Sequence, residues 1–449
     1  MTRDEVPAAH GMTVRGAAFL GVGAMVGAGI FALLGEAGQV AGSAVWISFV
    51  LGGAVATLLG YVVAKLGATY PSSGGIVTFL RLGFGRGHLT GIASWLLYFA
   101  AIIVTSMVAV SFGSYASALF LGNDADPVWG HVFTTVVVVG VAVVNVLGTE
   151  LIDRVQSLVV VLLLAVFGVF VVVTWTQVDV TLLAPSTYPP ALDIVSSIAL
   201  TFFAYLGFAV ISYTGAALPN PARNLPRAMF LALGITTLLY VLVSIGVFGT
   251  LSVEDVIRYG DTALAEAARP VLGQAGFAMM AVAALLATSS SVNANIYGAV
   301  GSTSELSAEG QFPPVFGARA LHGGSRGLTI SVIVVLLLAN LVDLSAIASL
   351  GSVVALAIFL LIAVAGWRLR SATGSRATVI LVAIASTTVV LVVFVVQTLR
   401  DEPATFVAMA AVLLLAVVLE AVWSRVRTRR GAHAPVQAPG TSDGDDAEA

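Results

Sequence analysis

The chain has 449 residues, of which 59% are hydrophobic and only 10% are charged, and its formal net charge is -3. This composition leaves too little polar surface to cover a soluble globule of that length, so lipid must be the main solvent. The basic residues form no stripe suited to nucleic acid, and the lack of cysteine excludes disulfides and thiolate metal sites.

Apolar runs long enough to cross a bilayer recur along the whole chain. They are apolar on all sides and too long for barrel strands, so the pattern predicts an all-α integral membrane protein with about twelve transmembrane helices. The runs extend approximately over Val14–Leu34, Gly42–Leu66, Leu89–Leu121, His131–Leu147, Leu158–Thr176, Ile194–Thr214, Ala228–Leu251, Val271–Val300, Leu328–Val342, Ile347–Val364, Val379–Val396 and Thr405–Val422.

Lysine and arginine are distributed unevenly among the connections between these runs. With a cytoplasmic N-terminus, all of the 20 basic residues except Arg258, Arg269 and Arg400 lie in the two tails and the even-numbered connections. Because basic residues favour the cytoplasmic side, the distribution predicts a multi-pass protein of the cell membrane with both termini in the cytoplasm.

The first run contains a glycine cluster, with Gly27 and Gly29 on either side of Ala28 near its middle. Glycine inside a helix costs about 1 kcal/mol relative to alanine, so this cluster favours unwinding. An unwound stretch exposes N–H groups at the positive end of the next half-helix, where a carboxylate can bind. Alternatively, Gly23 and Gly27 have the GxxxG spacing that allows close helix packing, and the spacing alone leaves both interpretations open.

The sixth run contains aromatic residues around one glycine, from Phe202 to Phe208 with Gly207 between them. Transporters often contain inverted repeats whose broken helices occupy corresponding places in the two halves, and the first and sixth runs fit that rule. Ordinary packing of the aromatic side chains is the alternative. No HExxH, GxSxG, Walker A or dinucleotide motif occurs, so we expect neither an enzyme nor a bound cofactor, and no metal site.

Several motifs in order resemble the amino acid-polyamine-organocation (APC) superfamily of permeases, from about Arg15 to Trp423. The resemblance implies a core of two inverted five-helix repeats, with broken helices 1 and 6, and two peripheral helices at the C-terminal side. The motifs are Gly27–Phe31, Pro71–Gly75, Phe203–Phe208, Asn220–Arg227 and Glu309–Pro314.

The resemblance also implies a set of site residues. Backbone amides from Gly27 to Phe31 would receive the carboxylate of an amino acid, and carbonyls near Met25 and Phe203 would receive its ammonium group. Phe203 is similar to an aromatic gate, while Ser106 and Asn295 are similar to residues that contact the substrate side chain. For Ser106 the alternative is a hydrogen bond to its own helix. The full predicted set is Met25, Gly27, Ala28, Gly29, Ile30, Phe31, Ser106, Phe203, Ala204, Tyr205, Gly207 and Asn295.

Two departures from the family pattern bear on the substrate. Relatives with cationic substrates carry an acid on or after helix 6, where this chain has Ala209, Ala216 and Ala217. The tyrosines that are common after the glycine pair are replaced by Ile76–Phe79. A neutral amino acid is therefore the expected substrate.

The coupling ion is left open between H+ and Na+. The fifth run lacks the lysine of some proton-coupled relatives, since Val161–Leu164 is wholly apolar. Hydroxyl and carbonyl oxygens suit a hard cation, and the alternative for such residues is helix packing. Glu36 and Glu305 are the candidate proton sites, and exchange or uniport is also consistent with the sequence. The candidate ion site comprises Gly23, Val26, Thr288, Ser289, Ser290 and Ser291.

The sequence thus predicts a secondary active permease for amino acids, working by alternating access. Two alternatives are a related amino acid sensor or subunit that does not transport, and an inorganic-ion cotransporter on the same fold. We expect an N-terminal tail over 1–13, a first repeat over 14–176, a second repeat over 192–370, two further helices over 377–426 and a disordered tail over 427–449.

Overall fold

The computed structural model describes residues 12–72, 74–85, 87–147, 152–308, 310–318 and 325–431. Most of the two expected tails, 1–13 and 427–449, lies outside these residues, as do Ser73 and Glu309 of the motifs. The side chain of Ala28 is also outside the description, although its backbone is helical.

The described residues form helices joined by short connections, which confirms the all-α class. Four short 3₁₀ turns lie in the connections as η1 (Gly42–Ala44), η2 (Pro185–Thr187), η4 (Gly260–Thr262) and η5 (Pro314–Phe316), and η3 (Leu206–Thr214) is longer. The α-helices are α1 (Val14–Ala28), α2 (Ile30–Ala41), α3 (Val45–Thr69), α4 (Gly75–Phe84), α5 (His88–Leu121), α6 (Val128–Leu147), α7 (Ile152–Thr174), α8 (Ala191–Ala204), α9 (Pro221–Phe248), α10 (Val253–Tyr259), α11 (Ala263–Glu266), α12 (Arg269–Ala308), α13 (Arg326–Leu341), α14 (Leu344–Arg368), α15 (Arg370–Thr373), α16 (Ala377–Asp401) and α17 (Pro403–Gly431).

Each predicted apolar run coincides with one of these helices or with a broken pair. The first run is divided into α1 and α2, and the sixth into α8 and η3. Within the described ranges, nine helical stretches are long and apolar enough to span a bilayer, while α1, α7 and α13 are shorter apolar helices. The fold class is confirmed, and the count of twelve spans stays a prediction.

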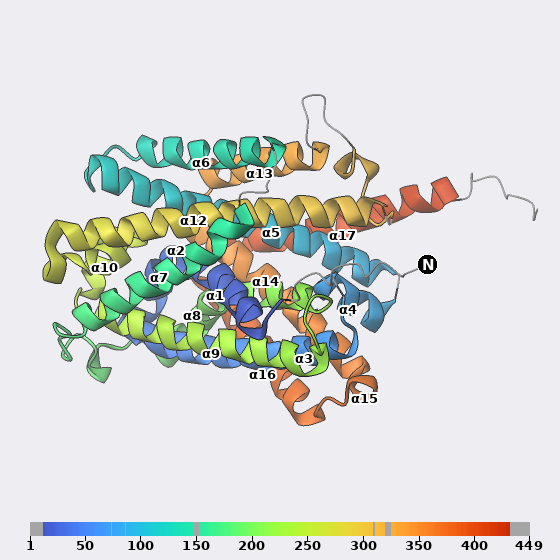
Figure 1. The fold of residues 1–449 in the computed structure, drawn as a ribbon, viewed down its shortest axis with the longest axis horizontal. Helices are drawn as coiled ribbons and strands as arrows, with labels where there is room; N and C mark the ends of the chain where they lie inside the picture. Colours follow the sequence, from blue (N-terminus) through green and yellow to red (C-terminus); the bar gives the residue numbers. More distant parts are fainter. Residues whose placement is uncertain are drawn as a thin grey trace, which may run out of the picture.

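The two halves of the chain have the same order of elements. Each begins with a broken helix, continues through four more helices, and has short helices between its second and third long ones, namely α4 in the first half and α10 with α11 in the second. In Figure 1 the labels α4 and α10 stand at opposite ends of the molecule. This arrangement is that of two repeats of opposite direction.

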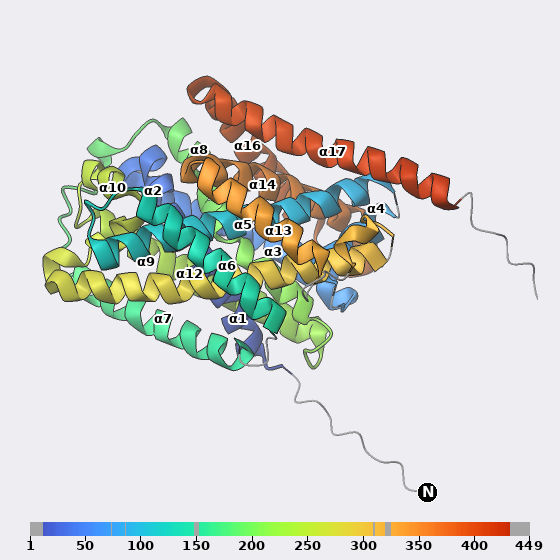
Figure 2. The ribbon, with the colours of Figure 1, turned by 90° about the horizontal axis from the view of Figure 1, so that it is seen from above.

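The last two helices lie at the edge of the molecule. Figure 2 shows α17 along one side, outside α14 and α5. Few residues of α16 and α17 are buried, whereas most of α14 is buried. Lipid therefore is the expected neighbour of α16 and α17, and the core lies between α1, α3, α5, α8, α12 and α14.

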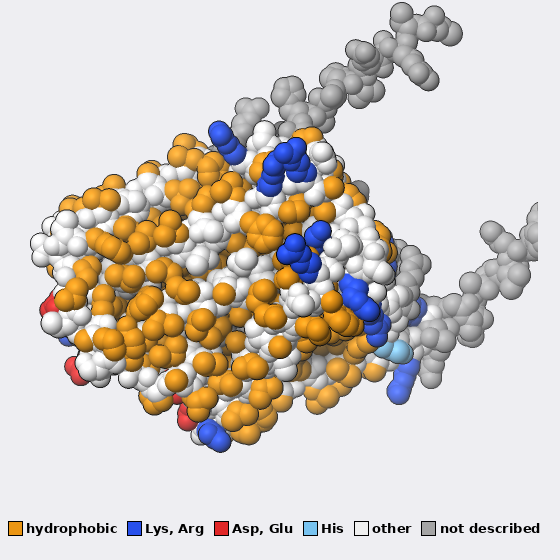
Figure 3. Space-filling view, turned by 90° about the horizontal axis from the view of Figure 1, so that it is seen from below, with side chains coloured by type: hydrophobic (Ala, Val, Ile, Leu, Met, Phe, Trp, Pro, Cys, Tyr) orange, Lys and Arg blue, Asp and Glu red, His pale blue; other side chains and the backbone are white. Residues whose placement is uncertain are grey.

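Basic side chains gather at one end of the molecule, as Figure 3 shows. We call this the basic end; α4, which contains Arg81, and α15, which contains Arg370, lie at this end in Figure 1. Acidic side chains lie at the other end in the same view.

Candidate functional site

The break in the first run is narrower than the glycine cluster predicts. We expect Gly27, Ala28 and Gly29 to unwind together, but α1 continues through Ala28 and α2 begins at Ile30. Gly29 alone leaves the helix, with φ -93° and ψ -70°. Its N–H donates to the Met25 carbonyl at 2.8 Å and its carbonyl accepts from the Leu33 N–H at 2.9 Å, so helical bonds on both sides limit the unwinding.

The break in the sixth run is longer and has another form. α8 ends at Ala204, Tyr205 forms the junction, and the chain continues as the 3₁₀ helix η3. A 3₁₀ helix longer than about four residues is uncommon and often marks a functional hinge. The aromatic cluster around Gly207 therefore changes helix type here and does not form an open loop.

The two breaks pack against each other through their glycines. A Cβ on Gly29 would lie only 2.6 Å from the carbonyl oxygen of Ala204 at the end of α8. A Cβ on Gly207 would lie 2.9 Å from Cβ of Ala24 and closer still to the backbone N of Met25. Each glycine thus leaves room for the backbone of the other broken helix.

Tyr240 of α9 lies at the same junction. Its hydroxyl is 2.7 Å from the Met25 carbonyl oxygen and 3.1 Å from the Ala204 carbonyl oxygen. The side chain is fully buried. One hydroxyl proton is therefore shared between carbonyls in the final turns of α1 and α8, and the Met25 carbonyl also keeps its bond from the Gly29 N–H.

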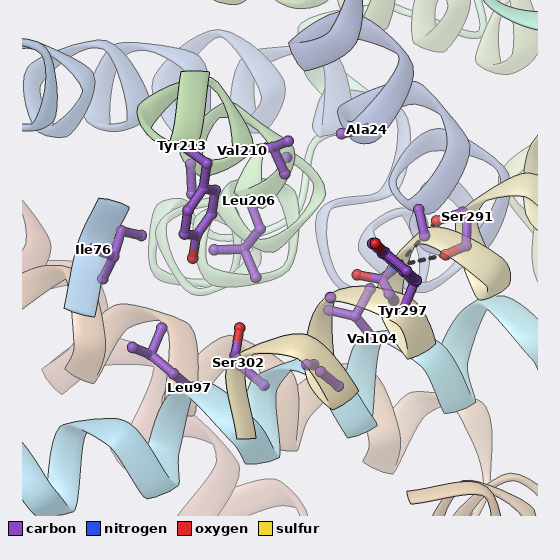
Figure 4. A pocket seen from close by; sticks show the side chains of 18 of the residues that line it. Ala24, Ile76, Leu97, Val104, Leu206, Val210, Tyr213, Ser291, Tyr297 and Ser302 are labelled. Carbon is purple, nitrogen blue, oxygen red and sulfur yellow. Dashed lines mark hydrogen bonds between the residues drawn. The ribbon is translucent and has the colours of Figure 1, made fainter. Parts of the chain in front are cut away.

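A cavity of about 530 Å³ lies beside the two breaks, a size suited to a small organic molecule. Figure 4 shows Leu206, Val210 and Tyr213 of η3 on one side of it and Ser291 and Ser302 of α12 on another. Further lining residues come from α1, α4, α5, α7 and α14. The cavity reaches the exposed side chains of Tyr213 and Ser302, which are toward the basic end of η3 and α12.

Beyond the break in the first run, the start of α2 is covered by aromatic packing. The ring of Phe31 contacts the rings of Tyr115 and Phe167, with centroids 5.8 Å and 5.2 Å apart. All three side chains are almost completely buried and none lines the cavity. Aromatic packing therefore fills the space around the start of α2, outside the cavity.

None of the described residues that line the cavity is charged. Hydroxyl and amide groups lie mainly along α12, at Ser291, Asn295 and Ser302, and face aliphatic side chains such as Leu97 and Val104 of α5. The amide of Asn295 donates to the Ser291 carbonyl at 2.9 Å and also lies 3.2 Å from its hydroxyl. The arrangement can accept an uncharged molecule with one polar side and one apolar side.

Several predicted site residues do line this cavity. Phe203, Ala204, Gly207 and Asn295 of the predicted substrate set are among its lining residues. From the candidate ion site, the lining includes Gly23, Ser290 and Ser291.

Other predicted residues point elsewhere. Ser106 donates to Ile102 of its own helix at 2.9 Å and lies 3.4 Å from the Val335 carbonyl, so the alternative interpretation describes it. The hydroxyl of Tyr205 donates to the Phe49 carbonyl of α3 at 2.9 Å. Neither residue lines the cavity.

The first-helix residues of the predicted set lie behind the cavity wall. Met25 and Ile30 are fully buried, and the Met25 carbonyl already accepts two hydrogen bonds. Gly27 packs on α12, where a Cβ would lie 3.1 Å from the Ala287 carbonyl oxygen and 3.4 Å from Cβ of Ser291. The break is thus beside the cavity, and its amides are covered in this conformation.

The candidate ion site is only partly assembled. α1 approaches α12 at Gly27 and Ser291, as an ion site formed by these two helices requires. Val26, the neighbour of Gly27, is buried. However, the hydroxyl of Thr288 donates to Ala284 at 2.6 Å and that of Ser289 to Leu286 at 3.2 Å, both within α12. These two hydroxyls therefore have partners in their own helix.

Glu36 lies deeper than the sequence suggests. We expect it beyond the first helix at the membrane interface, but it is buried within α2, where it interacts electrostatically with Asp261 of η4. The first run is longer in the structure than the apolar pattern, since α2 continues to Ala41. Glu305, the other candidate proton site, is exposed near the end of α12.

Sequence reasoning missed Tyr240, Tyr98 and Tyr213. The last two line the cavity, and the Tyr98 hydroxyl lies 3.2 Å from the hydroxyl of Ser331. The sequence signal that could have identified them is a tyrosine inside an apolar run, because its buried hydroxyl requires a hydrogen-bond partner.

Comparison with known proteins gives a consistent result. A family model described as amino acid permease matches residues 12–419. The inner membrane transport protein YbaT of Escherichia coli (strain K12) is 30% identical over 91% of this chain and 95% of its own length. A methylthioribose transporter of Bacillus subtilis (strain 168) is 26% identical over 77% of this chain and 78% of its own length.

Among solved structures, a manganese transporter of Eremococcus coleocola, crystallised in a mutant form, has a similar fold. Its TM-score is 0.60 at 16% sequence identity, and the match covers 95% of this chain and 97% of the other. At this identity the similarity concerns the fold alone.

Proposed function

The chain belongs to the amino acid permease family, and on that premise we propose that it carries a neutral amino acid across the cell membrane by alternating access. Membership in a family of transporters means that the chain is a multi-pass membrane protein and not an enzyme. The substrate, its charge, the coupling and the orientation are the proposed parts.

The observation that carries the proposal is an uncharged cavity beside two broken helices. An ionised side chain brought into this cavity would lose water without gaining an opposite charge from the described lining, which is energetically unfavourable. A neutral side chain meets the apolar face at Leu97 and Val104 or the polar face at Asn295. The cavity therefore favours a substrate with no net charge.

Helix ends can hold the two charges of an amino acid without a charged side chain. Carbonyls at the end of α8, where Phe203 and Ala204 line the cavity, form the negative end of that helix. The first N–H groups of α2, from Ile30 onward, have no partner within α2 and form a positive end. We propose that ammonium and carboxylate bind at these two ends.

Access to the α2 amides requires a change of shape. Tyr240 and the Ala204 carbonyl now stand directly against Gly29. We infer that binding moves η3 and the end of α8 relative to α1, which is the movement expected for alternating access at a repeat interface. We propose that the conformation in hand, with the cavity reaching exposed side chains toward the basic end and the start of α2 packed against aromatic rings, is one of the two end states and is inward-facing by the positive-inside rule.

The test is counterflow of a panel of radiolabelled L-amino acids in proteoliposomes, with Asn295→Leu compared with Asn340→Leu. Both changes replace an amide by an isosteric apolar group, but Asn340 of α13 lies outside this cavity. We expect saturable counterflow that falls about tenfold in Asn295→Leu, the equivalent of one hydrogen bond, and is retained in Asn340→Leu. Absence of counterflow for every amino acid would refute the proposal.

A second candidate substrate is a neutral thioether sugar, favoured by the match to a methylthioribose transporter. The same cavity could hold it, because it also has a polar and an apolar side. Methylthioribose belongs in the panel for this reason, and counterflow of this compound alone would replace the amino acid. Specific binding of an amino acid without any flux would indicate the sensor alternative.

The coupling ion can be identified by measuring uptake into the same vesicles with sodium and proton gradients imposed separately. A sodium requirement that disappears in Ser291→Ala would support the ion site between α1 and α12. Proton-driven uptake that disappears in Glu36→Gln would support the alternative. Uptake unaffected by either gradient would indicate exchange or uniport.

Orientation can be tested with single cysteines, because the chain has none of its own. We propose that the basic end faces the cytoplasm and that the repeats extend over 14–176 and 192–370, with 377–426 as peripheral helices. An impermeant thiol reagent added to whole cells should label Asp124→Cys, between α5 and α6, and spare Ser371→Cys in α15. The reverse pattern would invert the topology.

A further inference from the structure

Phe203 forms part of the wall of the cavity. It is in the last turn of α8, lines the cavity and is only 3% exposed. Its ring does not extend across the cavity, because it lies back against α14 at Gly351. The position of this ring therefore affects how much of the cavity is open beside the end of α8.

The lack of a side chain at Gly351 provides the space that the Phe203 ring occupies. A Cβ at this position would lie 2.5 Å from Cε1 and 2.8 Å from Cε2 of Phe203, and closer still to Cζ. Real Cβ atoms essentially never approach within 3.0 Å of a non-bonded heavy atom from elsewhere in the chain. Any residue other than glycine at this position would therefore require the ring to move.

The backbone conformation at position 351 does not itself require glycine. The residue is inside the regular helix α14, and it is not among the described glycines with positive φ. Glycine inside a helix costs about 1 kcal/mol relative to alanine. The ring of Phe203 is the feature that accounts for it.

We propose that Gly351 is a specificity-determining residue, which sets the upper size of the substrate by allowing Phe203 to lie away from the cavity. The inference rests on the proposed function, since it concerns the same cavity. A side chain at 351 would push the ring toward the cavity, which is the adjacent open space. The contact involves the far end of a flexible side chain, so Gly351→Ala should fold with a shorter cavity.

The experiment compares counterflow of L-alanine with that of L-leucine and L-phenylalanine, as kcat/KM ratios, in proteoliposomes. In Gly351→Ala we expect the ratio of large to small substrate to fall about tenfold, as for one methylene group excluded from a pocket. Gly366→Ala is the matched control: the same change in the same helix, where the new Cβ would meet Val62 of α3 and not the cavity. Its ratio should equal that of the wild type.

Rescue distinguishes a specific effect from general damage. Phe203→Leu in the Gly351→Ala background should restore the ratio, because a smaller side chain needs less space behind it. A wild-type ratio in an active Gly351→Ala variant would overturn the inference. If Gly351→Ala is inactive, recovery of counterflow in the double variant supports the inference, and failure to recover overturns it. Lack of counterflow in the wild type would refute the proposed function itself, and the inference would fall with it.

Discussion

The hydroxyl of Tyr240 lies 2.7 Å from the carbonyl oxygen of Met25, and this contact joins α9 to the last turn of α1. The same hydroxyl is 3.1 Å from the Ala204 carbonyl, which ends α8. One side chain therefore links both broken helices, and a movement of either break must change its hydrogen bonds.

Tyr240→Phe should weaken this junction. The change removes a donor shared by the Met25 and Ala204 carbonyls, of which the Met25 carbonyl keeps the Gly29 N–H, and an unmade buried hydrogen bond costs about 1 to 3 kcal/mol. We expect a lower Tm in detergent together with altered counterflow, whereas Tyr70→Phe at the end of α3 should leave both unchanged. An unaltered Tm in Tyr240→Phe would mean that the contact contributes nothing to stability.

Gly207→Ala should disrupt the packing of η3 on α1. The new methyl group would meet the backbone at Ala24 and Met25, which cannot move aside as a side chain can. Gly234→Ala in α9 is the matched control, since a Cβ there meets nothing within 4 Å and should stabilise the helix by about 1 kcal/mol. Yields of folded protein by size-exclusion chromatography and counterflow should fall for Gly207→Ala only. Equal behaviour of the two variants would contradict the close contact.

Ser106→Ala should leave the substrate profile unchanged. Its hydroxyl donates to Ile102 in its own helix, and the side chain does not line the cavity. We expect a change in KM smaller than about twofold for every substrate, because removing such a local bond affects the helix and not the site. A selective loss of transport of one substrate in this variant would show that Ser106 contributes to the binding site.

Stability should depend on pH through Asp261, which lies in η4 outside the membrane-spanning helices. Burial raises the pKa of this carboxyl above its ordinary value of 3.8, although the Ser114 hydroxyl, 2.6 Å away, opposes the shift. The folded state therefore holds the proton more tightly than the unfolded state, and stability decreases as pH rises above the ordinary value. The Tm of the wild type should fall with pH more steeply than that of Asp261→Asn.

Tryptophan fluorescence during heating at a series of pH values provides the measurement. Ser114→Ala should extend the fall to higher pH, because it removes a hydrogen bond that favours the charged carboxylate and so raises the pKa of Asp261 in the folded state. Identical pH profiles for the wild type and Asp261→Asn would contradict the role of this residue.

Local sequence signals predicted the positions of the two helix breaks. Glycine weakens a helix wherever it stands, and Gly29 and Gly207 are at or next to the observed breaks. The extent of unwinding was not predictable in the same way. At Gly29 two ordinary helical bonds persist, whereas η3 keeps 3₁₀ geometry through nine residues.

Whether a polar side chain lines the cavity depends on which face of its helix it occupies. Asn295 lines the cavity, while Ser106 lies on another face of α5 from Val104 and Met107. Both are polar residues in apolar runs, and their sequence context does not distinguish them. The difference depends on the rotation of each helix about its axis, which packing against other helices determines.

The sequence by itself determined that this is a helical membrane protein with breaks in its first and sixth helices, because hydrophobicity and glycine act locally along the chain. Only the tertiary structure decided which residues form the cavity, and that Tyr240 and Gly351 belong to its support. Tyr240 is 215 residues from Met25 and 36 from Ala204, and a contact over such separations has no local signature. It follows from the way whole helices pack, where each buried hydroxyl needs a partner and each ring needs space.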